Sequence, residues 1–241
     1  MEIINMYLTH NRPYTKRSKT TAIAVHYVGN AGSTAKGNRN YFQNTTVSVS
    51  SNYIIGLNGE VICCIPDDEV SWCTNQANSY TVSIECCHPK SDGVFNEATY
   101  NSLVELCAML CKKYNLNPLN GGLIRHFDVT GKVCPMNFVP KKNGGTDDNN
   151  ASNWTKFKND VAAQLSSNTS TSTSYLVKVN SSDGFVNIRK TPKFVDSDIV
   201  GKIENSNIKY TIVAETTVDG IKFGKLKSGA GWIALSCTKK V

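Results

Sequence analysis

The sequence predicts two unequal folds in one chain: an α/β domain with a central mixed sheet covered by helices, then a small all-β barrel. Three observations predict this division. Residues 1–165 alternate strand-like and helix-like stretches. Residues 166–174 read SSNTSTSTS, which carries no charge and no apolar periodicity and is typical of a flexible linker. Residues 175–241 contain only short strand-like runs separated by turn residues.

The strand patterns of the first domain are short and rich in β-branched residues. Thr21–Tyr27 (TAIAVHY) is apolar enough for a buried strand, and Thr81–Cys86 (TVSIEC) has the same character. Asn52–Leu57 and Glu60–Ile65 flank Asn58-Gly59, which is a strong two-residue hairpin signal. The sequence therefore predicts two separate strands and one hairpin.

Two helices are predicted in the same domain. Asn96 is a suitable cap for a helix that runs to about Tyr114, and a second helix begins at about Asn153. Apolar residues at helical spacing give each helix one face to bury. These faces consist of Leu103, Leu106, Cys107, Leu110, Cys111 and Tyr114 in the first helix, and of Trp154, Phe157, Val161 and Leu165 in the second.

The second domain shows no helical period. Its strand-like runs are LVKV, FVNIR, IVGKI, YTIVAE, IKFGKL and GWIAL. This domain is also the more basic one, with 11 lysine and arginine residues against six acidic residues, which is +5 of the net +7. Such a charge favours an anionic partner, such as a wall polymer, a nucleic acid or a membrane surface, although a solvated surface explains it equally well.

Composition excludes several classes of protein. Of the 241 residues, 40% are hydrophobic and 19% charged, as in a globular protein, and no apolar run reaches the ~18–20 residues that span a bilayer. Met1–Lys19 is polar and lacks the apolar core of a secretory signal, so we expect a cytoplasmic chain. The nine cysteines include two adjacent pairs, which argues against a disulfide framework and for buried thiols.

Four histidines, at positions 10, 26, 88 and 126, are the first candidates for chemistry. His26 ends a strand pattern, and His126 lies seven residues before Cys134 in the polar loop RHFDVTGKVCP. Histidine and thiolate suit zinc, and three protein ligands with one open position describe a catalytic zinc site. A strand histidine is, however, also a common core residue, so spacing alone leaves both interpretations open.

Four segments in order, IAVHYVGN, SNYIIGLNGEV, VSIE and RHFDVTGKVCP, resemble the type 2 N-acetylmuramoyl-L-alanine amidases, whose fold is shared with peptidoglycan recognition proteins. The resemblance covers about residues 1–165 and is greatest for phage endolysins that act on Gram-positive walls. It implies hydrolysis of the amide between the lactyl group of N-acetylmuramic acid and L-alanine of peptidoglycan. It also implies Zn²⁺, and a chain held in the host cytoplasm until a holin releases it to the wall.

Site residues follow from the same resemblance. His26, His126 and Cys134 match the zinc ligands of the family. Glu85 matches its catalytic glutamate, which moves a proton from water to the leaving amine. Lys132 matches a family lysine, and its cation would stabilise the oxyanion.

Two further residues are weaker candidates for substrate contacts. Asn78 precedes the VSIE strand, where relatives have polar substrate contacts. Asp128 either contacts substrate, orients a ligand histidine or caps a helix or loop.

The sequence departs from some family members near the site. Ser51 stands where some members have a catalytic tyrosine, and Tyr53 follows two residues later, which leaves the role of Tyr53 open. Cys73 stands where many members have a histidine; it could approach the site, although packing is the favoured role. His88 is expected to be a surface or loop residue instead of a ligand, and His10 has no evident partner.

The second domain resembles bacterial SH3 domains, which implies that it binds the cell wall. The resemblance rests on FVNIRKTP, Gly201, YTIVAE, Asp219-Gly220 and GWIAL. Four residues near its turns could form a groove for wall peptide, although Phe223 and Trp232 could be core residues instead, which is the favoured position for Trp232: Tyr210, Phe223, Trp232 and Arg189.

Three other functions remain as alternatives. A non-catalytic recognition protein would have the same fold, but Cys134 is retained. A zinc peptidase could cut within the stem peptide, because a fold does not determine which bond is cut. Binding of nucleic acid by the basic tail has no support from the motifs of the first domain, and we expect none.

Overall fold

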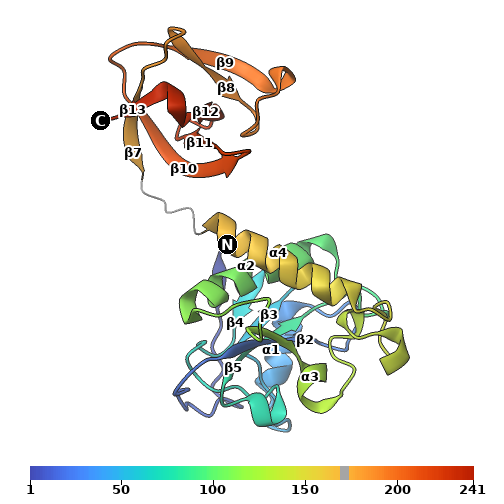
Figure 1. Ribbon diagram of the computed structural model, residues 1–241. Helices are drawn as coiled ribbons and strands as arrows, with labels where there is room; N and C mark the ends of the chain where they lie inside the picture. The colour runs from blue at the N-terminus through green and yellow to red at the C-terminus, as the bar shows by residue number, and fades with distance from the viewer. Residues whose placement is uncertain (169–173) are drawn as a thin grey trace. The chain divides into compact units, whose positions relative to one another are not determined.

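The computed structural model describes residues 1–168 and 174–241 and divides into two compact units, Met1–Leu165 and Ser166–Val241 (Figure 1). Helix α4 (Ser152–Asn168) runs into the stretch predicted as a linker, so Ser166–Asn168 are helical instead of coil. Residues 169–173 of that predicted linker lie outside the described residues.

The first unit is built on a six-stranded mixed sheet, which confirms the predicted fold class. In spatial order its strands are β1 (Ile3–Asn5), β4 (Val61–Cys63), β3 (Tyr53–Ile55), β5 (Thr81–Cys86), β2 (Ala22–Tyr27) and β6 (Leu123–Arg125). The hairpin strands β3 and β4 are antiparallel, and all other neighbours are parallel. The pattern does not predict the edge strands β1 and β6, because three residues are too few to show a two-residue period.

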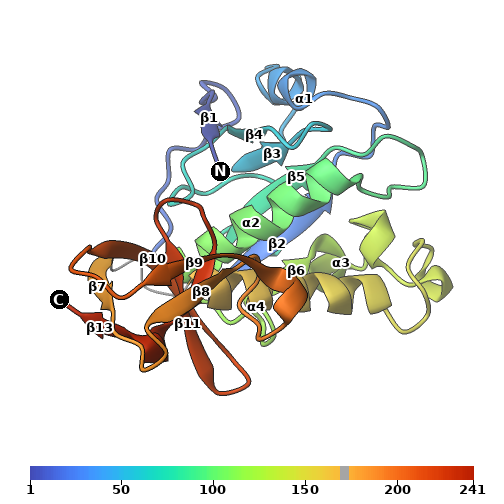
Figure 2. The same ribbon diagram turned by 90° about the horizontal axis from the view of Figure 1, so that it is seen from above.

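Helices α2 (Glu97–Tyr114) and α4 pack on one face of this sheet, and Figure 2 shows α2 crossing over its strands. Asn96 caps α2 as predicted, since its side chain accepts a hydrogen bond from Thr99 N at 2.9 Å. The buried faces of both helices match the predicted apolar positions. Seven of the nine cysteines are buried, as expected for buried thiols, and all nine are free.

Helix α1 (Ala35–Phe42) lies on the opposite face of the sheet and is not predicted by the sequence pattern. Thr34 caps it by accepting a hydrogen bond from Gly37 N at 3.1 Å. Its only buried residues are Ala35, Asn38 and Phe42, which is too thin an apolar stripe to recognise. Phe42 packs with Leu8, Ile54 and Ile62 in a second, smaller core.

Strand alternation separates the two faces chemically. Val25 and Ile84 point into the core beneath α2 and α4. His26 and Glu85, the next residues along β2 and β5, are paired in register and face the other side. Both stand near the carboxyl ends of parallel strands, which is the edge where open α/β sheets bind their ligands.

The second unit is all-β, as predicted. Its seven strands form one antiparallel sheet, and the pattern misses only the three-residue strand β13. In spatial order they are β13 (Thr238–Lys240), β7 (Tyr175–Val179), β10 (Tyr210–Val218), β11 (Ile221–Leu226), β12 (Trp232–Ala234), β8 (Phe185–Arg189) and β9 (Ile199–Glu204).

The structure contradicts the expectations for Trp232 and Arg189 in the second unit and supports the core alternative for Phe223. Phe223 is fully buried and belongs to the interior instead of a surface groove. Trp232, expected in the core, stays half-buried, with Lys225 Nζ 5.9 Å from its ring centre. Arg189 is also buried, where it donates a hydrogen bond to Val195 O at 3.0 Å. Alternation between the faces of a short twisted strand decides these positions, and the local sequence does not specify which face turns inward.

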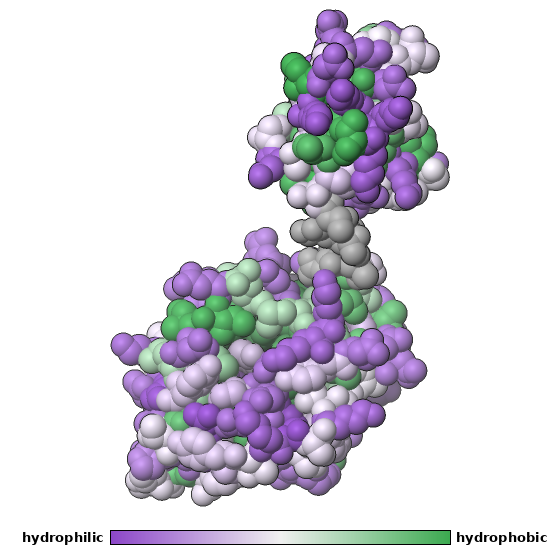
Figure 3. Space-filling view, turned by 90° about the vertical axis from the view of Figure 1, so that its left-hand side faces the viewer, coloured by the Kyte–Doolittle hydropathy of each residue, from purple (hydrophilic) through white to green (hydrophobic). Residues whose placement is uncertain are grey.

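On the face drawn in Figure 3, hydrophilic residues predominate on both units and are interspersed with smaller hydrophobic patches. Among the described residues, none of the helices has both the length and the apolar character needed to span a bilayer.

Candidate active site

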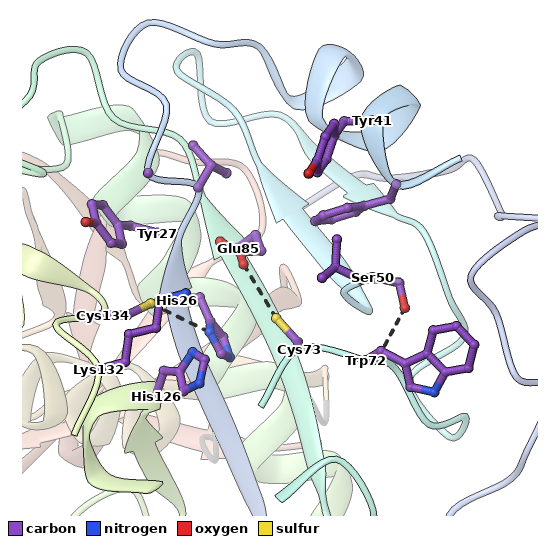
Figure 4. Close-up of a pocket in the computed structure, with 14 residues that line it drawn as sticks. His26, Tyr27, Tyr41, Ser50, Trp72, Cys73, Glu85, His126, Lys132 and Cys134 are labelled. Atoms are coloured by element: carbon purple, nitrogen blue, oxygen red, sulfur yellow. Dashed lines mark hydrogen bonds between the residues drawn. The ribbon is translucent and has the colours of Figure 1, made fainter. Parts of the chain in front are cut away.

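A cavity of about 300 Å³ opens at the carboxyl ends of β2 and β5 (Figure 4). Its lining combines reactive side chains with aromatic rings. The reactive group consists of His26, Cys73, Glu85, His126, Lys132 and Cys134, and the aromatic group of Tyr27, Tyr41, Phe42 and Trp72. The structure therefore brings together five of the seven residues that the sequence proposes for the site, along with Cys73.

His26, His126 and Cys134 converge on one point although they come from three segments. One ligand atom from each lies within 4.8 Å of the others, and Cys134 Sγ is 3.7 Å from His26 Nδ1. A tetrahedral zinc ion with Zn–S of about 2.3 Å and Zn–N of about 2.05 Å separates sulfur from nitrogen by about 3.6 Å. The three side chains, which line the cavity, are thus spaced as a zinc ion would require.

The protonation states of these groups suit a metal site. Burial, with a contribution from His126 and Lys132, lowers the pKa of His26 well below its usual value. Burial and Lys132 lower the pKa of His126 to about 4. Both imidazoles are therefore neutral near pH 7, which is the form that binds metal. Burial and Glu85 raise the pKa of the Cys134 thiol to about 12, so metal binding there would displace a proton.

His126 begins the short helix α3 (His126–Thr130), so the expectation of a polar loop at this point is wrong. Asp128 belongs to the cap of this helix. Its carboxylate accepts a hydrogen bond from Arg125 N at 2.8 Å and pairs with the Arg125 guanidinium at 2.5 Å. Within the described chain it makes no hydrogen bond to either ligand histidine, so capping is its observed role among those considered.

Glu85 faces the cavity beside the proposed ligands. Cys73 Sγ lies 3.5 Å from Glu85 Oε1, whereas Oε2 is buried and has no hydrogen-bond partner among the described residues. Burial raises the pKa of Glu85 to about 7, against the opposing effects of the Cys73 hydrogen bond and the Lys132 charge. A carboxyl group that titrates near neutral pH can both accept and return a proton.

Cys73 is therefore not a packing residue, and that expectation is wrong. It is half-buried in the cavity wall and contacts Glu85 directly. Burial and the Glu85 carboxylate raise the pKa of its thiol well above the usual value, so it stays protonated and can donate to Glu85. Lys132 is an exposed residue of the loop after α3, and it reaches the cavity from the side of His126 (Figure 4).

Asn78 lies behind the cavity and is not among its lining residues in the described structure. Its Oδ1 accepts hydrogen bonds from the backbone amides of Cys73 and Thr74, at 3.1 Å and 2.7 Å. Asn78 therefore holds the chain beside the site instead of facing into it.

Tyr53 lies in the core beneath α2, on the face of the sheet opposite Glu85, and burial raises the pKa of its hydroxyl. Tyr53, whose role the sequence leaves open, is therefore a core residue. His88 lies in a loop, one of the two positions expected for it, but it is buried there: its Nδ1 is 2.7 Å from Lys90 O and its ring lies 5.1 Å from that of Tyr27. His10 is exposed.

Sequence reasoning misses two residues that contact the histidine ligands from behind. Thr74 Oγ1 is 3.0 Å from His26 Nε2, and Asn75 Oδ1 is 2.9 Å from His126 Nε2. Threonine and asparagine in a polar turn are common, so the sequence contains no signal for these contacts.

A family model for N-acetylmuramoyl-L-alanine amidases (Amidase_2) matches residues 16–137, which is half of the chain and contains all the residues of the cluster. The chain belongs to this amidase family. The function expected from the sequence, that of an N-acetylmuramoyl-L-alanine amidase, is thereby confirmed at the level of the family.

Curated relatives of this amidase support the same assignment. The amidase BlyA of Bacillus subtilis (strain 168) is 27% identical over 94% of this chain and 69% of its own length. The amidase CwlL of Bacillus licheniformis is 31% identical over 56% of this chain, which matches only 41% of CwlL. The chain therefore spans about two thirds of BlyA and less than half of CwlL.

Solved structures match the fold of the first unit. PlyL aligns with a TM-score of 0.56 at 22% identity, over 67% of this chain and 97% of that structure. A mutant endolysin from Bacillus subtilis aligns at 0.53 and 22% identity, over 67% of this chain and 99% of that structure. At such identities the likeness establishes the fold alone.

Proposed function

We propose that the first unit is a zinc-dependent hydrolase that cuts the amide between the lactyl group of N-acetylmuramic acid and L-alanine, and that it acts as an endolysin. The observation that carries the proposal is the meeting of three zinc-type ligands with the unpartnered Glu85 Oε2 in one cavity. Membership of the amidase family specifies which bond such a site would cut.

His26, His126 and Cys134 would hold the metal. When bound, zinc supplies a Lewis acid that activates water at neutral pH and polarises a carbonyl. The remaining tasks of the protein side chains are to transfer one proton and to stabilise one negative charge.

Glu85 performs the proton transfer in this proposal. Its carboxylate takes a proton from water as the oxygen adds to the amide carbon, and gives a proton to the nitrogen as the carbon–nitrogen bond breaks. The products are a free lactyl carboxylate and a free amino group on L-alanine. Lys132 stabilises the negative charge on the carbonyl oxygen during the addition.

The surroundings of Glu85 leave room for a long substrate. A second hollow of about 470 Å³ adjoins the first and shares Val28, Tyr41, Phe42 and Glu85 with it. Glu85 therefore stands between two open spaces, as cleavage in the middle of a glycan–peptide conjugate requires. Exposed aromatic rings at the rim, Tyr41 and Trp72, offer apolar faces to sugar and peptide.

For the second unit we propose a bacterial SH3-like domain that binds the cell wall. Its antiparallel all-β fold and its positive charge support this role. Covalent attachment to the amidase raises the effective concentration of the catalytic unit near its substrate. Release from the host cytoplasm through a holin is the proposed setting, in line with the endolysins whose fold the first unit shares.

The test is mass spectrometry of Gram-positive peptidoglycan digested with and without a zinc chelator. We expect new L-alanine amino termini on released stem peptides, and none with chelator. Cleavage within the stem peptide would show a zinc peptidase instead. Intact wall with bound protein would show a recognition protein, and either of these results would overturn the proposal.

A further inference from the structure

We propose that a single turn, Thr74–Asn78, is the positioning element for both histidine ligands, with Thr74 orienting His26 and Asn75 orienting His126. This inference rests on the metal site of the proposed function. It assigns a role to residues that neither touch substrate nor bind metal, and that come from a segment far from both histidines in sequence.

Thr74 acts on His26 from inside the protein. The threonine is fully buried, and its Oγ1 is 3.0 Å from His26 Nε2 and 2.8 Å from Ser83 Oγ. The other ring nitrogen of His26, Nδ1, is the one that lies 3.7 Å from Cys134 Sγ. A lone pair on Nδ1 requires the proton on Nε2. In this arrangement Nε2–H donates a hydrogen bond to Thr74 Oγ1, which leaves the Thr74 hydroxyl hydrogen free to point to Ser83 Oγ.

Asn75 acts on His126 in the same way. Its Oδ1 is 2.9 Å from His126 Nε2, and an amide oxygen only accepts hydrogen bonds. His126 must therefore carry its proton on Nε2, which leaves Nδ1 free. One pair of consecutive residues thus selects the same tautomer in two imidazoles whose rings are 4.8 Å apart.

Side-chain hydrogen bonds within the turn and to α3 hold the turn in place. Asn78 Oδ1 accepts from the amides of Cys73 and Thr74, and Gln76 Nε2 donates to Val129 O in α3 at 3.0 Å. Asn75 has φ of 54°, a left-handed conformation that asparagine tolerates and β-branched residues do not. The side chain that accepts from His126 is therefore also one that allows the turn to form.

The physical consequence is a site prepared before the metal arrives. Each imidazole has a hydrogen bond to this turn that opposes ring rotation and favours one tautomer, so metal binding costs less conformational entropy. Removing a hydrogen-bond partner of this kind typically weakens metal affinity by about 10–100-fold.

The variants remove or keep the side-chain oxygen that contacts each histidine while preserving the backbone conformation of the turn. Thr74→Val removes the hydroxyl at similar volume, and Thr74→Ser keeps it. Asn75→Gly keeps the left-handed conformation but loses the oxygen, and Asn75→Asp keeps an oxygen. Matched controls lie in α2 and its C-terminal cap: Thr99→Val at a buried threonine that donates to Gly56 O, and Asn115→Gly at an asparagine with φ of 53°.

Zinc affinity is measured by chelator competition, and histidine tautomers by ¹⁵N NMR of the metal-free full chain. We expect Thr74→Val and Asn75→Gly each to weaken zinc by about 10–100-fold. We also expect each to remove the Nε2–H preference of its own histidine only. Thr74→Ser and Asn75→Asp should restore both properties, and the two control variants should change neither.

Native zinc affinity in Thr74→Val and Asn75→Gly, or an equal loss in the two controls, would overturn the positioning role. If the native chain bound no zinc, the proposed metal site would fail. The tautomers of the metal-free chain would still decide the inference, because mixed tautomers in the native protein contradict it and Nε2–H tautomers that depend on Thr74 and Asn75 support it.

Discussion

The two faces of the central sheet use the same strands for different purposes. Beneath α2 and α4, Val25 and Ile84 are fully buried among apolar neighbours. On the other face, the adjacent residues His26 and Glu85 enter a polar cavity, where Glu85 Oε2 lacks a partner among the described residues. Burial of apolar side chains stabilises one face. On the other face, burial disfavours the charged form of the Glu85 carboxyl group. Residues that stabilise the core and residues that line the cavity are thus adjacent in sequence on the same strands.

The largest expected effect is loss of a metal ligand on the polar face. His126→Ala should reduce amidase activity by at least about 10³-fold, because a metal Lewis acid contributes several kcal/mol and 1.36 kcal/mol is a factor of ten. Zinc content, measured by atomic spectrometry, should fall with the activity. His10→Ala, at an exposed histidine, is the control and should keep both. An active, zinc-free His126→Ala variant would contradict the assigned ligand.

Glu85→Gln should reduce turnover by about 10²–10⁴-fold, the usual contribution of a general acid–base group. Glutamine keeps the shape of the side chain but cannot accept the proton from water. Zinc affinity should remain near that of the native chain, which separates this variant from ligand loss. Glu97→Gln, at an exposed glutamate on α2, should leave turnover unchanged. Native turnover in Glu85→Gln would remove Glu85 from the mechanism.

On the apolar face, Ile84→Ala should lower the free energy of unfolding by about 2–5 kcal/mol, as expected for a buried isoleucine that leaves a cavity. Denaturant unfolding measures this loss. Where the variant is still folded, its turnover should stay close to native, because Ile84 faces away from the cavity. Ile4→Ala, at a residue that is 44% exposed, should cost far less. A large loss of turnover in folded Ile84→Ala would show that the two faces are coupled.

The smallest effect concerns the pH dependence of stability in the metal-free protein. Glu85 has a folded-state pKa of about 7, raised from 4.5, so the folded chain binds this proton more tightly than the unfolded chain. Its contribution is therefore most favourable below pH 4.5 and declines as the pH rises to about 7. Since one pKa unit is 1.36 kcal/mol, Glu85→Gln should gain at most about 3 kcal/mol relative to native at pH 8 and nothing at pH 4. Equal differences in unfolding free energy at the two pH values would contradict the raised pKa.

Several contacts near the site could not be predicted from local sequence. The pattern favours packing for Cys73 and gives His88 only as a surface or loop residue, yet Cys73 contacts Glu85 and the loop residue His88 is buried. Helix α1 is missed because only three of its residues are buried. In each case the outcome depends on which distant segment covers the residue, and periodicity within one segment carries no information about its neighbours.

The sequence by itself determined the central strands, the Asn58-Gly59 hairpin and the Asn96 cap, and its resemblance to the amidases singled out His26, His126 and Cys134, which the structure brings together. These features depend on residues that are close in the chain or on motifs that are read locally. Only the tertiary structure decided that Cys73 meets Glu85, that Thr74 and Asn75 stand behind the two histidines, and that Asp128 caps α3. The physical reason is separation along the chain. The contacts of His26 span 48 residues to Thr74 and 108 residues to Cys134, and only the packing of the sheet brings such segments together.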